Sequence, residues 1–496
     1  MTKSGGKPIN AGGYGCLFIP ALKCKNKTRR KNSVSKLLMK YHAEKEYKMI
    51  DFFKSKLQDI PNYKKYFAIE DIEMCRPDKL TKKDLINFNN ICLNLKYLSS
   101  KTINDNLDKV RIINMPDLGV DFDKFISNTK ITSENFVVIN TLMVNLLEYG
   151  IIPMNKKNIL HLDIKSNNIM VTQDSNVKLI DWGLSMINDG KIPETILNFP
   201  ITFNMPFSSI ILNKRFQEFI NTIIKKNPTI LNDDPINTSS LKISIVNYFY
   251  ILMNEIGLGQ FGYLNMIISN LYLPFMSKIP NPDLNNISTY YYTMNHIIDY
   301  IIPIVRKFTK NNKFNAELYY KNVFVKNVDI WGFVMCYEKY LSFLGYNNLP
   351  ENNQLKKHDN KNLYMLLRDI YINILFSNPT EPIDTTKLIE KLKQLNKLFV
   401  NIKKVTFNTP LKQVTEKKTR KIKYTPYPTL KSTYSRSMSE TSTPSIDYTL
   451  KELSKNFKRT RSRTQRSKTR RHRNKPYHVT KSSLYTNREL DKLFNL

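Results

Sequence analysis

The chain has 496 residues with 77 Lys plus Arg against 42 Asp plus Glu, a formal charge of +35. Hydrophobic residues make up 41% of it, enough to bury a sizeable core, so a wholly disordered chain is excluded. No run of 18 uninterrupted apolar residues occurs, so we expect no transmembrane segment.

The five cysteines are scattered along the chain, at Cys16, Cys24, Cys75, Cys92 and Cys336. Their odd number and the lack of short paired spacings argue against a disulfide scaffold and against a cysteine zinc site. This usage is typical of an intracellular, reducing compartment.

A glycine-rich motif follows a flexible N-terminus at residues 1–8. It reads Asn10-Ala11-Gly12-Gly13-Tyr14-Gly15-Cys16-Leu17-Phe18. Glycine lacks Cβ, so backbone N–H groups can approach a phosphate chain closely, here in a predicted strand–turn–strand lid. Alone the motif is weak, because a flexible glycine-rich terminus would have the same composition.

The strongest motif follows a predicted helix over 131–150 with Thr132 or Ser133 as its N-cap. It reads His161-Leu162-Asp163-Ile164-Lys165-Ser166-Asn167-Asn168, and is followed by Leu179-Ile180-Asp181-Trp182-Gly183. Two acids and an amide on adjacent loops suit a divalent metal and a hydroxyl nucleophile, and a nearby lysine suits a phosphoryl group in transfer. The joint spacing disfavours the alternative, an ordinary surface loop with an Asx turn.

These motifs resemble those of eukaryotic-type serine/threonine protein kinases. The resemblance implies an α+β, bilobal protein-kinase-like fold, protein substrates, and ATP and Mg²⁺ as cofactors. Asp163 and Lys165 match the catalytic pair, while Asn168 and Asp181 match the metal-binding pair. Farther on, Val328-Asp329-Ile330-Trp331-Gly332-Phe333 resembles the helix that anchors the catalytic loop, with Asp329 accepting hydrogen bonds from that loop.

The segment Met115-Pro116-Asp117-Leu118-Gly119-Val120-Asp121-Phe122 resembles the hinge of the casein kinase one and vaccinia-related branch. That match implies Met115 as gatekeeper, with Asp117 and Leu118 facing adenine. The chain also resembles serine/threonine kinases of large nucleocytoplasmic DNA viruses. This viral resemblance implies host cytoplasm, a virus factory, a virion or, through the basic tail, the nucleus as its location.

The lysine that holds the α- and β-phosphates is harder to place. Lys36 lies 21 residues after Gly15 and has the flanking residues expected of the strand lysine, while Lys23 and Lys40 are rivals. Glu46 is the expected partner on the next helix, with Glu44 as second choice. The short interval predicts a helix trimmed at its start.

Three departures from the kinase pattern are visible. Asn10 replaces the first loop glycine, and Leu162 replaces an arginine that commonly binds a phosphorylated activation segment, so we expect no need for that phosphorylation. Met205-Pro206-Phe207-Ser208 stands where A-P-E is expected but lacks its glutamate, and 378–382 lacks the arginine partner. Because both halves of the ion pair are missing together, we predict an alternative packing.

We therefore predict a kinase domain over residues 9–400. Its parts are an N-lobe at about 9–114, a hinge at 115–119, and a C-lobe at 120–400 with a helical insertion at about 210–320. The insertion contains Gly257-Leu258-Gly259-Gln260-Phe261-Gly262, which we interpret as a helix–helix turn because no suitable strand lysine follows it. The alternative function is a pseudokinase scaffold or binding module that acts through the insertion and the tail.

Residues 401–496 hold 25 Lys plus Arg against 6 Asp plus Glu and are rich in Ser, Thr, Tyr and Pro. They lack a sustained apolar period, so we predict a disordered basic tail. Three roles stay open for it: a solvated appendage, a tether for nucleic acid or an acidic partner, and a nuclear localisation signal.

Overall fold

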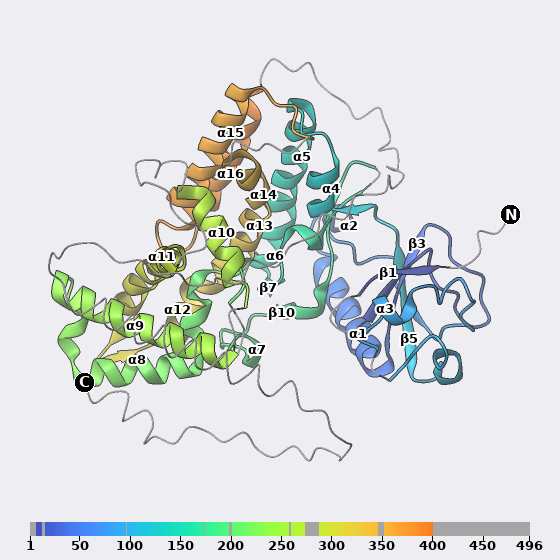
Figure 1. Ribbon diagram of the computed structural model, residues 1–496, viewed down its shortest axis with the longest axis horizontal. Coiled ribbons are helices and arrows are strands. Elements are labelled where there is room, and N and C mark those ends of the chain that lie inside the picture. The colour runs from blue at the N-terminus through green and yellow to red at the C-terminus, as the bar shows by residue number, and fades with distance from the viewer. Residues whose placement is uncertain are drawn as a thin grey trace, which may run out of the picture. The chain divides into compact units, whose positions relative to one another are not determined.

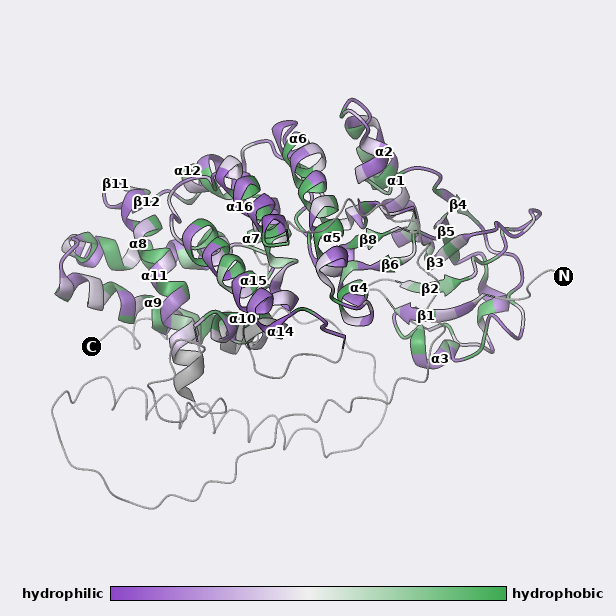
Figure 2. Cartoon of the chain, turned by 90° about the horizontal axis from the view of Figure 1, so that it is seen from above, coloured by the Kyte–Doolittle hydropathy of each residue, from purple (hydrophilic) through white to green (hydrophobic). Residues whose placement is uncertain are grey.

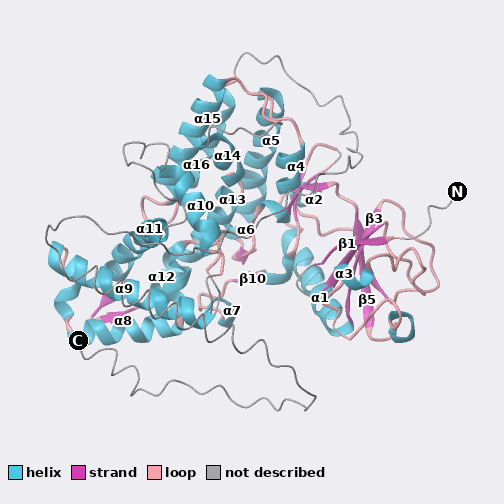
Figure 3. Cartoon of the chain, viewed as in Figure 1, coloured by secondary structure: helices cyan, strands magenta, loops and turns pink. Residues whose placement is uncertain are grey.

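The computed structural model describes residues 6–11, 15–95, 97–172, 174–197, 201–256, 259–272, 287–345 and 352–399. Met1–Gln413 form one compact unit, and every described element belongs to it. The predicted tail, and Gly12, Gly13 and Tyr14 of the glycine motif, lie outside the described residues. Figure 3 shows strands gathered toward the N-terminal part and helices dominating the rest.

The N-terminal lobe is built on one five-stranded antiparallel sheet (Figure 1). Its strands are β1 (Lys7–Ala11), β2 (Gly15–Ile19), β3 (Ser33–Met39), β4 (Glu73–Cys75) and β5 (Val110–Pro116). Their order across the sheet is β1-β2-β3-β5-β4, so β1 and β4 are the edge strands. The two strands predicted for the lid correspond to β1 and β2, which pair antiparallel, and the predicted turn between them falls on residues 12–14, outside the described residues.

Both faces of this sheet are covered, because neighbouring strand residues point to opposite sides. On one face Leu38 and Ile113 pack against Ala43 of helix α1 (Lys40–Leu57). On the other face Leu37 and Ile112 pack into a second cluster that includes buried residues from 80–103. This second layer comes from residues 76–109, an insertion between β4 and β5 that we call the cap.

The cap was not foreseen from the sequence. Its short elements are α3 (Phe88–Ile91) and the 3₁₀ turn η1 (Ile103–Asn106). Phe88, Cys92 and Leu95 are buried against Phe18 of β2 and its neighbours. Sequence periodicity could not reveal the cap, because its elements are only four residues long and are held by contacts with the sheet.

Two disulfides join the sheet to its surroundings, so the expectation of no disulfide framework is wrong. Cys16 of β2 pairs with Cys92 of the cap, and Cys24 pairs with Cys75 of β4, with Cα–Cα distances of 5.1 and 5.8 Å. Cys336 is the remaining free cysteine and is buried. The partners are 76 and 51 residues apart in sequence, and only the folded sheet brings them within bridging distance.

The C-terminal lobe begins with a small sheet and a long apolar helical run. Its first elements are β6 (Val120–Asp121), α4 (Phe122–Asn128), α5 (Ser133–Leu146), η2 (Leu147–Ile151), α6 (Ile152–Lys156), β7 (Ile159–Leu160), β8 (Ile169–Val171), β9 (Val177–Leu179) and β10 (Met186–Ile187). Thr132 caps α5, as predicted, and its side chain accepts the N–H of Asn135. Among the described residues, only the run Ser133–Lys156 is long and apolar enough to cross a membrane, and half of it is buried in the fold, as a core helix would be.

The predicted insertion is helical, with one short hairpin. Its elements are α8 (Lys214–Lys226), α9 (Pro235–Ile256), α10 (Phe261–Tyr272), α11 (Ile287–Lys307), β11 (Thr309–Lys310) and β12 (Lys313–Phe314). Helices such as α8 and α15 (Lys357–Ile370) carry hydrophobic residues beside hydrophilic ones, as a helix with one buried face requires (Figure 2). Gly259, in the literal G-x-G-x-x-G, has φ +50 just before α10 and lies against Ile201, consistent with a turn.

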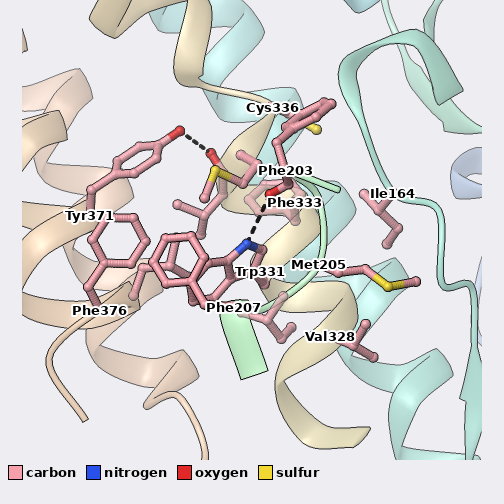
Figure 4. Packing of buried hydrophobic residues seen from close by; sticks show 14 of the residues in the cluster. Ile164, Phe203, Met205, Phe207, Val328, Trp331, Phe333, Cys336, Tyr371 and Phe376 are labelled. Carbon is pink, nitrogen blue, oxygen red and sulfur yellow. Dashed lines mark hydrogen bonds between the residues drawn. The ribbon is translucent and has the colours of Figure 1, made fainter. Parts of the chain in front are cut away.

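Helix α13 (Val325–Met335) is buried along almost its whole length. The other helices of this part of the chain are α12 (Ala316–Tyr319), η8 (Tyr320–Phe324), α14 (Glu338–Gly345), α15, η9 (Tyr371–Leu375) and α16 (Thr385–Lys397). Trp331 of α13 lies beside Phe207 and Phe376, with ring centroids 4.8 and 5.3 Å away, and its indole N–H donates to the Phe203 carbonyl (Figure 4).

This aromatic cluster provides the alternative packing predicted for the missing ion pair. Phe207 stands in the M-P-F-S segment, where it is buried against Trp331. At the other half of the missing pair, Asn327 donates to the Glu381 carbonyl and accepts the N–H of Ile383. The two segments that lack the charged pair are thus packed through an aromatic ring and an amide.

The Cys16–Cys92 bridge closes a long loop, so its removal should lower stability strongly. We expect the Cys16→Ala, Cys92→Ala variant to lose on the order of 4 kcal/mol of unfolding free energy. Urea denaturation monitored by circular dichroism measures this loss. The single variant Cys336→Ala closes no loop and serves as control, and equal urea midpoints for both variants would contradict the bridge.

Candidate active site

The catalytic motif lies in the loop between β7 and β8, and one buried carboxylate holds it there. Asp329 of α13 accepts the backbone N–H groups of His161 and Leu162 at 2.8 and 2.9 Å, and its Oδ2 also accepts the amide of Asn155. Leu162 has φ +63, a left-handed conformation that is costly for a side chain with Cβ. The two bonds to Asp329 stabilise the loop in this strained shape.

A glycine brings α13 up against the same loop. A Cβ added to Gly332 would lie 2.5 Å from the Ile164 carbonyl oxygen and 3.2 Å from that of Asn204. No real side chain fits at that distance, so the close approach requires glycine. Gly332 follows Trp331 directly in α13, and its backbone is the part of the helix that lies against the loop.

Three side chains converge on the carboxylate of Asp163. Lys165 Nζ lies 2.9 and 2.8 Å from its two oxygens, and Asn168 Nδ2 donates to Oδ2 at 2.8 Å. Asn204 Nδ2 donates to Oδ1 at 3.0 Å. Asp163 is therefore held as an oriented hydrogen-bond acceptor with a cation beside it.

Asn204 was missed by the sequence reasoning. It directly precedes the M-P-F-S segment and is buried, 41 residues from Asp163 in sequence. Its contact with Asp163 depends on how the segment after β10 returns to the loop. A single asparagine with no recognisable motif around it gave no signal for this role.

Asp181 lies beside the catalytic loop because β8 and β9 form an antiparallel hairpin. Ile169 pairs with Leu179, and the Asn168 carbonyl accepts the N–H of Ile180 at 2.9 Å. Asn168 and Asp181 therefore flank the same end of the hairpin. Asp181 has φ +68, and its exposed carboxylate accepts the N–H of Gly183.

Trp182 ties this end of the hairpin to the N-terminal lobe. Its buried ring stacks on Phe53 of α1 at 5.5 Å and contacts the edge of His161 at 5.1 Å. Complete burial lowers the pKa of His161, and this effect outweighs the negative charges of Asp329 and Asp163, which raise the pKa. Neutral His161 accepts the Asp163 N–H at Nδ1, which leaves Nε2 to donate to the Ile180 carbonyl.

The N-terminal lobe contains the ion pair that the sequence predicts between Lys36 and Glu46. Lys36 Nζ lies 2.7 and 2.8 Å from the two carboxylate oxygens of Glu46 in α1. Both side chains are about one-fifth exposed. The rivals lie elsewhere: Lys23 pairs with Asp78, and Lys40 lies 4.0 Å from Glu44. The predicted trimmed helix is real, since α1 begins directly after β3 at Lys40.

The side chains at the end of the glycine motif lie on opposite faces of the sheet. Leu17 lies opposite Lys36 across β2 and β3, so the two share a face of the sheet. Cys16 and Phe18 are fully buried on the other face, under the cap, so only their backbone can line a nucleotide site. Asn10 and Ala11 end β1.

Gly15 and the hinge are also placed. A Cβ on Gly15 would meet the Leu37 carbonyl at 2.5 Å, so this glycine is required by the close approach of β2 and β3. Met115 pairs with Val34 near the end of β5. Beyond it, the N–H of Asp117 donates to the Asn32 carbonyl, and Leu118 precedes Gly119, which has φ +98.

Residues 7–203 match the family model of the protein kinase domain. The fold is that of a kinase domain with mixed helices and strands. The matched range includes the glycine motif, Lys36, Glu46, the hinge and the catalytic loop, and ends just before Asn204. No match to the chain was found among curated proteins.

Removal of the Asp329 carboxylate should destabilise the kinase domain. The Asp329→Ala variant leaves the buried N–H groups of His161 and Leu162 without their acceptor, at a cost of about 3 kcal/mol. Thermal and urea unfolding measure the loss. Asp59→Ala, which removes an exposed ion pair with Lys157, is the control and should change stability by less than about 1 kcal/mol. Equal losses in the two variants would contradict an anchoring role.

Proposed function

We propose that the protein transfers the γ-phosphoryl group of ATP to Ser or Thr hydroxyls of protein substrates. The observation that carries the proposal is the convergence of Lys165, Asn168 and Asn204 on the Asp163 carboxylate. A carboxylate held in this way can orient a hydroxyl and accept its proton. The lysine two residues after the aspartate supports Ser/Thr rather than Tyr specificity.

The residues present fit a magnesium–nucleotide complex. The described residues include no group of three or more His, Cys, Asp or Glu side chains suited to a metal. Mg²⁺ is usually held by one or two protein oxygens together with phosphates and water, so a protein cage is not needed. Asn168 uses its amide nitrogen toward Asp163, so its Oδ1 and the exposed Asp181 carboxylate are the ligands that we assign.

The chain's own groups account for the remaining steps. Bound Mg²⁺ would neutralise charge on the phosphate oxygens. Lys36, oriented by Glu46, holds the α- and β-phosphates, and the glycine motif at 10–18 covers them through its backbone. Asp163 orients the acceptor hydroxyl and takes its proton, while Lys165 stabilises the moving phosphoryl group. Met115, Asp117 and Leu118 are proposed to border adenine.

A pseudokinase scaffold is the competing function. A short interval that kept Lys36 and Glu46 apart would favour the scaffold, and the ion pair between these residues argues against it. The decisive experiment incubates the purified full chain with radiolabelled ATP and a generic basic protein, with and without Mg²⁺. Magnesium-dependent labelling of Ser or Thr supports the kinase, and nucleotide binding without transfer supports the scaffold.

The motifs also suggest which kinases the protein is related to and where it acts. We propose kinship with the casein kinase one and vaccinia-related branch and with kinases of large nucleocytoplasmic DNA viruses, on the hinge and loop motifs. We also propose an intracellular location, in host cytoplasm, virus factory, virion or nucleus. The tail at 401–496 is proposed to bind nucleic acid or an acidic partner. The cysteine spacing no longer supports a reducing compartment, because four of the five cysteines form disulfides and structural disulfides are rare in such compartments.

Asp181 is the sharpest test of the metal assignment. We expect Asp181→Asn to abolish turnover while leaving the fold intact, because the carboxylate is exposed and the hydrogen bond that it accepts from the N–H of Gly183 is a local one within the same turn. Phosphoryl transfer and the circular dichroism spectrum are measured on the same preparation. Retention of near wild-type turnover would discredit the assignment.

Lys36 and Lys40 provide a matched pair for the phosphate-binding role. Lys36→Ala should raise the dissociation constant of ATP or lower turnover by about 10-fold or more, since a charge-assisted contact is worth roughly 1.5–3 kcal/mol. Lys40→Ala removes an exposed charge four residues away and should leave both quantities unchanged. Calorimetry and steady-state kinetics distinguish the two. A larger effect from Lys40→Ala would reverse the assignment.

A further inference from the structure

The two disulfides differ in how well a reductant can reach them. Cys16, Cys92 and Cys24 are 0, 3 and 3% exposed, whereas Cys75 is only partly buried. Cys75 also lies on β4, an edge strand, while Cys16 lies on the interior strand β2. Thiol–disulfide exchange requires a thiolate to reach a sulfur, so access to Cys75 distinguishes the two bridges.

We propose that Cys24–Cys75 is a reversible thiol–disulfide exchange site, entered by an external dithiol at Cys75, whose redox state sets how tightly the N-terminal lobe holds nucleotide. The exchange itself stands on accessibility and pairing alone. Its effect on nucleotide rests on the proposed function.

The exchange reaction balances without any further reactant. A thiolate of the dithiol attacks Cys75 Sγ and forms a mixed disulfide, and the Cys24 sulfur leaves and takes up a proton. The second thiol of the dithiol then attacks its own sulfur in the mixed disulfide and releases the Cys75 thiol. Two electrons and two protons reach the protein, and the dithiol becomes a cyclic disulfide. Oxidation by a disulfide of the same class reverses both steps.

Cys24 is joined to the nucleotide strands by a buried polar network. The amide of Asn114 in β5 donates to Cys24 Sγ at 3.2 Å, and the hydroxyl of Ser35 in β3 donates to Asn114 Oδ1. Ser35 and Asn114 are 0 and 1% exposed and lie directly opposite each other in the sheet. A shift of the Cys24 sulfur therefore changes the hydrogen bonds of both strands, because the buried Asn114 and Ser35 side chains have no water with which to replace a lost bond.

The next residue on each strand belongs to the nucleotide site. Lys36, which pairs with Glu46, follows Ser35, and the hinge residue Met115 follows Asn114. Ser35 also accepts the N–H of Leu22 at 2.6 Å, which ties the network to the segment between β2 and β3. Opening the bridge frees Cys24 to move away from β4 and loosens this network at the place where Lys36 and Met115 are positioned.

Some contacts around the bridge survive its reduction, so the lobe should stay folded. The N–H of Lys25 donates to the Arg76 carbonyl at 2.9 Å, and that of Asp78 donates to the Lys23 carbonyl at 2.8 Å. The buried Cys16–Cys92 bridge also continues to hold the cap on the sheet. Reduction of Cys24–Cys75 therefore acts as an adjustment within a folded lobe.

The first measurement is the order in which the bridges open. The full chain is equilibrated in mixtures of reduced and oxidised dithiothreitol, alkylated with iodoacetamide, and analysed by peptide mass spectrometry. We expect Cys24 and Cys75 to be labelled together under conditions that leave Cys16 and Cys92 unlabelled. Simultaneous labelling of all four, or earlier labelling of Cys16 and Cys92, would overturn the exchange site. This readout does not depend on kinase activity.

The second measurement is the affinity for Mg²⁺-ADP, determined by calorimetry on the oxidised chain and on the chain with Cys24–Cys75 selectively reduced. We expect the reduced form to bind at least 3-fold more weakly. Cys75→Ser keeps the Cys24 thiol beside Asn114, so it should match the reduced chain and ignore dithiothreitol. Cys336→Ala should respond to dithiothreitol like the wild type.

The outcomes separate this inference from the proposed function. Equal affinities of the oxidised and reduced forms would overturn the coupling and leave the kinase proposal standing. Absence of ADP binding by both forms would overturn the coupling and the kinase proposal together. In that case, ordered labelling would still support the exchange site.

Discussion

The arrangement of the catalytic loop depends on the hydrogen bonds that the Asp329 carboxylate accepts. This carboxylate is buried on α13 and accepts two backbone N–H groups from the catalytic loop. Those bonds fix a loop whose second residue, Leu162, is in a strained left-handed conformation. The carboxylate is itself placed by α13, which fits against the loop because Gly332 has no side chain. The orientation of Asp163, Lys165 and Asn168 follows from this anchoring.

The N-terminal lobe is stabilised in a different way. Its sheet is covered on one face by α1 and on the other by the cap, so strands β3 and β5 carry hydrophobic residues in succession. Such a double layer explains why Cys16 and Phe18 of the glycine motif point away from the face of the sheet that carries Lys36. The same arrangement brings two pairs of cysteines together, one in the interior of the sheet and one at its edge. The lobe therefore combines a covalently fixed cap with an accessible bridge near the hinge strand.

Much of the fold was predictable because its signals are local. The Thr132 cap, the apolar spacing of α5 and the helices of the insertion follow from side chains within one or two turns of each other. The catalytic loop and the Asp181 turn were recognisable because their residues stand at fixed short intervals. The Lys36–Glu46 pairing was also found from sequence, because ten residues of strand and helix leave few partners for this lysine.

The amino-acid sequence by itself determined the kinase-like motifs, the helical character of the C-terminal lobe and the positions of the charged residues that meet at the catalytic loop. Tertiary structure alone decided the disulfide pairing, the cap on the outer face of the sheet and the contact of Asn204 with Asp163. The physical reason is distance along the chain: these partners are 41 to 76 residues apart, and no periodic pattern relates them. Their encounter depends on which strands pair and on how the segment after β10 returns, and both follow from the packing of the whole domain.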